Sequence, residues 1–214
     1  MTDIFIPTLR TDRINKIVSN ILETTNEISH IYFILEKADF ERLKSSQTQD
    51  YTFLLNKRSQ SYAGAINSAF EQTLGSYFFT GADDIVFQKG WLTNALALMS
   101  DIISVVGTND QFNREVLSGT HATHYLVKRE YIEEIGGTID NSFPVLYEYK
   151  HNYCDTEFIE TAKKRGVFKP CLSSIVRHNH WTKGRSKFDE VYRKSHLTKD
   201  EDKLTYDNRS YLWK

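Results

Sequence analysis

The chain has 214 residues and a formal net charge of −1, a size that suits one domain, or one domain with an appendage. The near-neutral charge excludes a strongly basic protein, so nucleic acid is not the default partner, although a local basic groove is left open. No apolar run is long enough to span a bilayer, and residues 1–13 lack the pattern of a signal peptide. Because Cys154 and Cys171 have no metal-site spacing, we expect a cytoplasmic protein with free thiols.

The first half of the chain alternates between two kinds of apolar pattern. Short runs without polar alternation are typical of strands buried on both faces, and the segments between them have helical spacing. This alternation predicts βαβ units and a doubly wound, mostly parallel α/β sheet flanked by helices, with ligands bound beyond the carboxyl ends of the strands. The expected strands are residues 4–6, 31–35, 51–56, 77–79 and 102–106, and the expected helices are residues 14–21 and 62–70.

The second half is less regular. Residues 120–137 predict a strand and a short helix that ends at two glycines, and residues 138–152 form an irregular stretch where a lid or binding loop could lie. Residues 154–166 predict a helix with Asp155 at its start and Gly166 beyond its end. From residue 183 onward the chain is polar and charged with three late aromatic residues, so we expect a docked or partly ordered tail.

Two adjacent acids, Asp83 and Asp84, directly follow an apolar run in "LGSYFFTGADDIVFQKGW". Neighbouring carboxylates repel each other and are poorly solvated beside a buried strand unless they are neutralised. A hard divalent cation with oxygen ligands would neutralise them. A turn or a helix cap, ahead of a helix beginning near Gln88, is the structural alternative. The pair alone leaves both interpretations open.

Five sequence blocks occur in a fixed order across most of residues 4–181: "FIPTLRTDR", "YAGAINSAFEQTLGSYFFTGADDIVFQKGWL", "HYLVKREYIEEIGG", "CDTEFIETAKKRG" and "VRHNHW". In this order they resemble a glycosyltransferase of the GT-A fold, close to the inverting family 2 type. The resemblance implies a single catalytic domain over residues 1–182, with a nucleotide-sugar half (1–110) and an acceptor half (111–182), followed by a charged tail (183–214). It also implies a UDP-sugar donor, Mn²⁺ or Mg²⁺, and a hydroxyl acceptor, for which a saccharide is the base-rate choice.

The resemblance assigns donor-binding residues to the first half. The segment "PTLR" matches the part of the family that contacts the nucleotide base, which implies Pro7, Thr8 and Arg10. Glu36 stands where these enzymes usually carry an Asp that hydrogen-bonds the base or ribose. Asn67 matches an Asn or Asp of the nucleotide-side helix.

The metal ligands come from the same resemblance. The segment "GADD" matches the family's Asp-any-Asp motif with Ala82 at the first position, so Asp84 is the expected metal ligand. Asp83 lies between these two positions and is counted with the donor-binding residues. The block "VRHNHW" supplies the late metal-binding histidine, as His178 or His180.

The expected catalytic base is Asp155, which matches the last acid of the family's Glu-Asp helix start, with Cys154 in place of the Glu. An inverting transfer needs one carboxylate to take the proton of the acceptor hydroxyl as the anomeric carbon is attacked. A divalent ion would stabilise the charge that develops on the departing diphosphate. Without the resemblance, Asp155 could equally be only a helix N-cap.

Other functions stay open at this stage. A nucleotidyltransferase would be expected to carry a glycine-rich phosphate loop after the first strand, and residues 7–13 contain no glycine. Ala82 and Cys154, at two motif positions, raise the alternative of a nucleotide- or sugar-binding module that has lost catalysis. A modified base in DNA is an alternative acceptor. The donor sugar, the acceptor and the linkage are not determined by the sequence.

Overall fold

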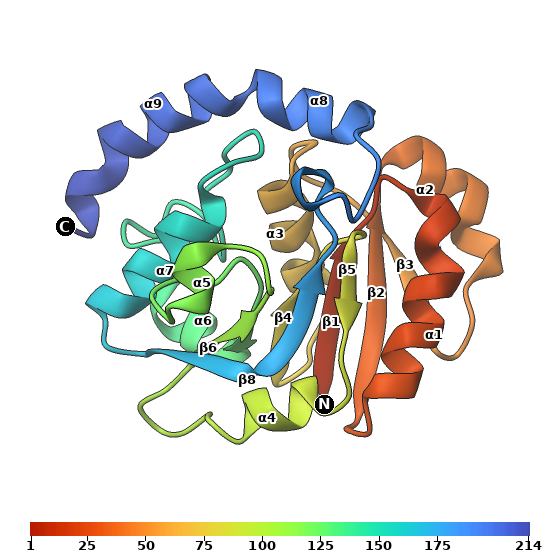
Figure 1. The fold of residues 1–214 in the computed structure, drawn as a ribbon, viewed down its shortest axis with the longest axis horizontal. Coiled ribbons are helices and arrows are strands. Elements are labelled where there is room, and N and C mark those ends of the chain that lie inside the picture. Colours follow the sequence, from red (N-terminus) through yellow and green to blue (C-terminus); the bar gives the residue numbers. More distant parts are fainter.

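The computed structural model describes all 214 residues except the side chain of Lys183, and it contains one eight-stranded sheet flanked by helices (Figure 1). The strand order is β3-β2-β1-β4-β7-β6-β8-β5, so the sheet runs through both halves of the chain. The strands are β1 Thr2–Pro7, β2 Ser29–Leu35, β3 Tyr51–Leu55, β4 Tyr77–Thr80, β5 Ile85–Phe87, β6 Val105–Asn109, β7 Tyr125–Lys128 and β8 Phe168–His178.

The sheet has a parallel half and a mixed half. Strands β3, β2, β1 and β4 pair in parallel, as the apolar runs predicted. Strand β7 is antiparallel to both β4 and β6, whereas β6 and β8 are parallel. Strand β5 pairs antiparallel with the last part of β8, with Ile85 opposite His178. This pairing brings the segment after the two acids beside the "VRHNHW" block.

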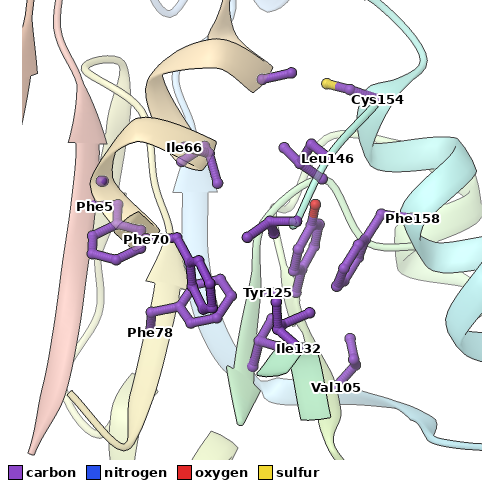
Figure 2. Close-up of a cluster of buried hydrophobic side chains, with 14 of the residues drawn as sticks. Phe5, Ile66, Phe70, Phe78, Val105, Tyr125, Ile132, Leu146, Cys154 and Phe158 are labelled. Carbon is purple, nitrogen blue, oxygen red and sulfur yellow. The ribbon is translucent and has the colours of Figure 1, made fainter. Parts of the chain in front are cut away.

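Alternate residues of the central strands enter two separate cores, which explains why the strands are apolar throughout. Phe5 and Phe78 pack on one face against residues of α3 Tyr62–Gln72, together with Tyr125 and Phe158 (Figure 2). Ile4, Ile6 and Phe79 face the opposite core, which is closed by α1 Ile14–Thr24 and α4 Trp91–Leu96. The remaining helices are α2 Lys37–Leu43, α5 Arg114–Leu117, α6 Arg129–Ile135, α7 Cys154–Lys164, α8 Glu190–Leu197 and α9 Lys199–Arg209.

Two sequence-based predictions of local structure were wrong. The strand expected at residues 102–106 begins only at Val105, where pairing with β8 starts, and Ile102 is 70% exposed in the preceding loop. The helix expected to begin near Gln88 is α4, which starts later, at Trp91, because strand β5 follows the two acids. In both places the available strand partner decided the structure, which local apolar spacing cannot encode.

The last 32 residues are docked on the rest of the molecule. Helices α8 and α9 form an arc along the edge of the molecule at which β1 ends (Figure 1). The buried Asp202 of α9 accepts the backbone N–H groups of Lys150, His151 and Asn152, at 2.8–2.9 Å. Trp213 is also buried. Among the residues that the structure describes, no helix is long and apolar enough to cross a membrane.

Candidate active site

Asp83 is held by the segment that follows β1. One carboxylate oxygen accepts the backbone N–H groups of Leu9 and Arg10, at 2.9 and 3.0 Å, and the other accepts the Arg10 guanidinium at 2.5 Å. Arg10 also makes a two-point ion pair with Asp189, the N-cap residue of α8. The carboxylate of Asp83 therefore fixes the expected base-binding loop to the end of β4.

Asp84 turns the other way, toward β8 and the tail. Its Oδ2 lies 3.3 Å from Nε2 of His178 and accepts a 2.8 Å hydrogen bond from the Tyr192 hydroxyl of α8. Burial favours the neutral acid, but the hydrogen bond and charge of His178 and the bond from Tyr192 outweigh it, so the pKa of Asp84 lies below its usual value. Asp84 is thus a buried anion whose Oδ2 faces an imidazole.

His178 is the last residue of β8, and its position there follows from the pairing of β8 with β5. Burial lowers the pKa of His178, but the hydrogen bond and the charge of Asp84 raise it by more than burial lowers it. The net shift of the pKa is therefore upward. Its Nδ1 is buried and has no hydrogen-bond partner among the described residues. The ring of His178 also packs against the ring of His180, with centroids 5.4 Å apart.

His180 lies beyond the end of the strand and is half-buried. Its Nδ1 is 2.9 Å from the Thr182 hydroxyl, in the cap of a short 3₁₀ turn, Trp181–Lys183. Burial, followed by the charge of His178, lowers the pKa of His180. Of the two histidines that the sequence left open, the structure brings His178 against Asp84.

Asp155 is the second residue of α7, and the N-cap is Tyr153 in a left-handed conformation with φ 69°. Its Oδ1 accepts the N–H of Thr156, and its Oδ2 lies 3.4 Å from Nε2 of His121. Asp155 is therefore not a side-chain N-cap. Burial raises the pKa of Asp155, but the hydrogen bond and the charge of His121 lower it by more than burial raises it. The net shift of the pKa is therefore downward. The charge of Asp155 also raises the pKa of His178.

The predicted donor-binding residues lie at several depths. Pro7 is half-buried at the end of β1, and the Thr8 hydroxyl donates to the carbonyl of Ile6 at 2.7 Å. Glu36 is the N-cap residue of α2 and accepts a 2.9 Å hydrogen bond from the Asn56 amide. These two ends of β1 and β2 lie side by side, because Pro7 is in register with Ile34.

Asn67 is fully buried in α3, and its side-chain amide hydrogen-bonds the backbone of the irregular stretch that precedes α7. Its Oδ1 accepts the N–H groups of Val145 and Leu146, and its Nδ2 donates to the carbonyl of Leu146 at 2.8 Å. In this structure the amide orders the 138–152 segment. The donor contact expected from the resemblance stays a prediction.

Sequence reasoning missed three neighbours of these residues. Tyr192 and Asp189 lie in the tail, far from the blocks that carried the resemblance, and reach Asp84 and Arg10 only through the docking of α8. His121 lies in "HATHY", where two histidines three residues apart precede β7. That spacing was the one available signal, because nothing local shows that His121 faces a helix that begins 33 residues later.

Asp84 and His178 could supply two of the ligands of a divalent ion whose remaining ligands do not come from the protein. No group of three or more His, Cys, Asp or Glu side chains among the described residues is arranged to hold a metal ion. Asp84 Oδ2 and His178 Nε2 are 3.3 Å apart, close to the spacing of about 3 Å between adjacent ligands of an octahedral ion with bonds of about 2.1 Å. One oxygen and one imidazole nitrogen suit Mn²⁺ better than Mg²⁺.

Comparison with known proteins identifies the fold. Neither a protein-family model nor a curated protein sequence matches the chain. Among solved structures, the chain is similar to the mannosyltransferase PcManGT from Pyrobaculum calidifontis, solved with GDP-Man and Mn²⁺, at 15% identity and a TM-score of 0.59. This match covers 83% of the chain and 56% of that protein, so the chain spans little more than half of the mannosyltransferase.

A second similar protein is glucosyl-3-phosphoglycerate synthase from Mycobacterium tuberculosis. Its complex with Mn²⁺, UDP-glucose and phosphoglyceric acid is 11% identical, with a TM-score of 0.59 over 84% of this chain and 72% of that one. Its complex with Mg²⁺ and UDP is 10% identical, with a TM-score of 0.62 over 94% and 79%. The chain therefore has the α/β fold of these glycosyltransferases. That fold is GT-A, as the order of the sequence blocks predicted.

Proposed function

We propose that this protein is a metal-dependent glycosyltransferase that moves a sugar from a nucleoside-diphosphate donor to a hydroxyl acceptor, with inversion. The observation that carries the proposal is the contact between Asp84 and His178 within a GT-A fold. These residues come from sequence segments more than 90 positions apart, and the sheet brings them together at the end where such folds bind ligands. Both similar proteins were solved with a divalent metal and a sugar nucleotide.

The donor half would be residues 1–110. Pro7, Thr8 and Arg10 follow β1 and Glu36 follows β2, so the ends of two adjacent parallel strands supply the nucleotide side. Asp83 keeps Arg10 and its backbone in place there. Asp84 and His178 would hold Mn²⁺ or Mg²⁺, which when bound supplies a Lewis acid that stabilises the departing diphosphate.

The acceptor half would be residues 111–182, with Asp155 as the base. Its lowered pKa keeps the carboxylate ionised at neutral pH, so it can accept the proton of the attacking hydroxyl as the glycosidic bond to the diphosphate breaks. The segment of residues 138–152, which Asn67 orders, leads directly into α7 and would line the acceptor side. We propose a UDP-sugar as the donor, with a saccharide as the default acceptor.

Nucleotide binding is the first test. Thermal unfolding should be measured with UDP, GDP, UDP-glucose and GDP-mannose, each with Mn²⁺ and with EDTA. A ligand that binds only the folded state at 100 times its Kd adds about 2.7 kcal/mol, so the correct diphosphate should raise the Tm in Mn²⁺ and lose most of that effect in EDTA. No metal-dependent shift with any of the four would contradict the proposal.

The role of Asp84 is tested by Asp84→Asn, which keeps the shape of the side chain and removes its charge. The Kd of the stabilising nucleotide in Mn²⁺ should rise at least about tenfold, because one of two protein ligands loses its charge. Asp101→Asn, at an exposed acid in the loop before β6, is the matched control and should leave the Kd unchanged. Equal Kd values for Asp84→Asn and wild type would remove Asp84 from the metal site.

Catalysis is tested separately, because a chain that binds donor without turning it over would be the degenerate binding module. Release of free sugar from the stabilising donor in Mn²⁺ measures turnover with water as the acceptor. Asp155→Asn should lower kcat by at least about a hundredfold and leave the donor Kd within a factor of two, since general base catalysis contributes about 10²–10⁴-fold. An unchanged kcat would exclude Asp155 as the base.

A further inference from the structure

His121 is the side chain that faces the proposed base. It lies in the loop between α5 and β7, is only 5% exposed, and has its backbone N–H bound to the carbonyl of Glu115 at 3.2 Å. Its Nε2 is 3.4 Å from Oδ2 of Asp155, while Oδ1 of Asp155 is taken up by the N–H of Thr156. The two carboxylate oxygens of Asp155 therefore have different partners, and the partner of Oδ2 is an ionisable one.

The charges around this pair come from three elements. On α7 they are Asp155 itself and Lys163, on α5 there is Glu115, and His124 stands at the start of β7. Burial lowers the pKa of His121, but Asp155, by its hydrogen bond and its charge, and Glu115 outweigh burial and Lys163, so the net shift is upward. His121 is thus a cation at pH values below the ordinary imidazole pKa of about 6.5, where it faces the Asp155 anion.

We infer that His121 is a positioning residue for the transfer reaction, which holds the carboxylate of Asp155 ionised and oriented toward the acceptor hydroxyl. This inference rests on the proposed function, because it gives Asp155 the role of base. A half-buried carboxylate without a partner takes up a proton at higher pH, and the protonated acid cannot accept another. His121 opposes this protonation through its contact with Oδ2 of Asp155. The remaining lone pairs of the carboxylate stay free to accept the proton of the acceptor hydroxyl. A residue that only filled space would not alter the ionisation of Asp155.

The pairing itself can be tested without any turnover. In protein labelled with ¹⁵N-histidine, the ring signals of the seven histidines are followed against pH, and His121 is assigned from the spectrum of His121→Gln. In wild type His121 should titrate above the ordinary value of about 6.5, and in Asp155→Asn its pKa should fall by about one unit or more. An unchanged titration of His121 in Asp155→Asn would overturn the inference.

The role in transfer is tested by the pH dependence of kcat for donor hydrolysis in Mn²⁺. Removal of the cation raises the pKa of Asp155, so the inactive protonated acid persists to higher pH. The acid limb of His121→Gln should therefore move up by about one pH unit or more, with the donor Kd unchanged. His30→Gln, at a half-buried histidine that bonds Thr52 on β3, is the matched control and should leave the limb in place.

The outcomes separate the two proposals. An active wild type with the same acid limb in His121→Gln would overturn the inference about His121 and leave the proposed function standing. A wild type that turns over none of the donors would overturn the proposed function and, with it, the role of His121 in transfer. If His121→Gln does not fold, His121→Asn replaces it in both measurements, and the titration of His121 in Asp155→Asn remains decisive for the pairing.

Discussion

The two neighbouring acids that end the apolar run "SYFFTGADD" have different partners and different tasks. Asp83 is neutralised by Arg10 and by two backbone N–H groups of the loop after β1. Asp84 is neutralised by His178, at the end of β8, the strand that pairs with β5. The two residues form a turn before β5, in which the side chain of Asp83 contacts the loop after β1 and the side chain of Asp84 contacts β8 and the tail.

The structural task of Asp83 predicts a loss of stability in Asp83→Ala. The variant removes the acceptor of the buried Arg10 N–H, of the part-buried Leu9 N–H and of the buried Arg10 guanidinium, which should lower the free energy of unfolding by about 2–4 kcal/mol. Urea unfolding measures this value. Asp101→Ala, at an exposed acid, should change it by no more than about 0.5 kcal/mol, and equal effects of the two substitutions would contradict the assignment.

His124 predicts a pH dependence of stability. Its Nδ1 donates to the carbonyl of Thr80, and its buried Nε2 has no partner among the residues that the structure describes. Burial, followed by the charge of His178, lowers its pKa from 6.5 to about 4. Between these values the unfolded chain binds the proton and the folded protein does not. Stability should therefore fall as the pH drops from 6.5 to 4, with about 3 kcal/mol of the loss due to His124.

The measurement is urea unfolding at several pH values from 7 to 4 for wild type and His124→Gln. The unfolding free energy of the variant should fall less steeply with decreasing pH. The difference in slope should correspond to the uptake of up to one proton on unfolding. Parallel curves for the two proteins would contradict a neutral buried His124.

At the scale of elements, α9 is attached to α7 by a buried ion pair. The Arg209 guanidinium makes two hydrogen bonds to Glu157, at 2.7 and 2.9 Å, and Glu157 is only 1% exposed. The Tyr149 hydroxyl donates to the same carboxylate at 2.6 Å. Arg209 also bonds Asp140, so one side chain of the tail holds both α7 and the irregular stretch before it.

The substitution Arg209→Met tests how much this ion pair contributes to the free energy of unfolding. The substitution leaves Glu157 buried with its charge uncompensated, which should cost about 3–5 kcal/mol of unfolding free energy. Arg209→Met combined with Glu157→Gln should recover part of the loss, because the unpaired charge is gone. The control is Arg193→Met, whose partner Glu190 is exposed, and its unfolding free energy should stay close to wild type.

At the scale of the whole molecule, the tail joins the two halves that the sequence distinguished. Helix α8 contacts residues 1–110 through Asp189 and Arg10, and α9 contacts residues 111–182 through Asp202 and the N–H groups before α7. The sheet also runs through both halves without interruption. We therefore expect the tail and the sheet to unfold as one cooperative unit.

This expectation is tested with Trp213, which is buried in the tail. In a protein whose other two tryptophans are replaced by phenylalanine, urea unfolding is followed by Trp213 emission and by far-ultraviolet circular dichroism. The two transitions should have the same midpoint. An earlier transition of Trp213 would show that the tail unfolds by itself.

The elements that the sequence predicted best are those whose own residues specify them. The buried strands β1, β2 and β4 and the helices α1, α3 and α7 were confirmed, because apolar runs and helical spacing are local signals. The predicted start of β6 was wrong, and the helix expected near Gln88 begins later, at Trp91, after strand β5; both boundaries depend on pairing with β8. The sequence blocks named the candidate site residues, whose roles stay predictions, and they did not name His121 or Tyr192.

The sequence by itself determined the fold type, the position of Asp84 after a buried strand and the position of Asp155 at the start of a helix. Only the tertiary structure decided which histidine meets Asp84, which residue faces Asp155, and where the tail lies. The physical reason is that hydrophobic spacing is periodic along the chain and is visible within one segment. A contact between side chains from distant segments depends on strand order and helix docking, which no single segment contains.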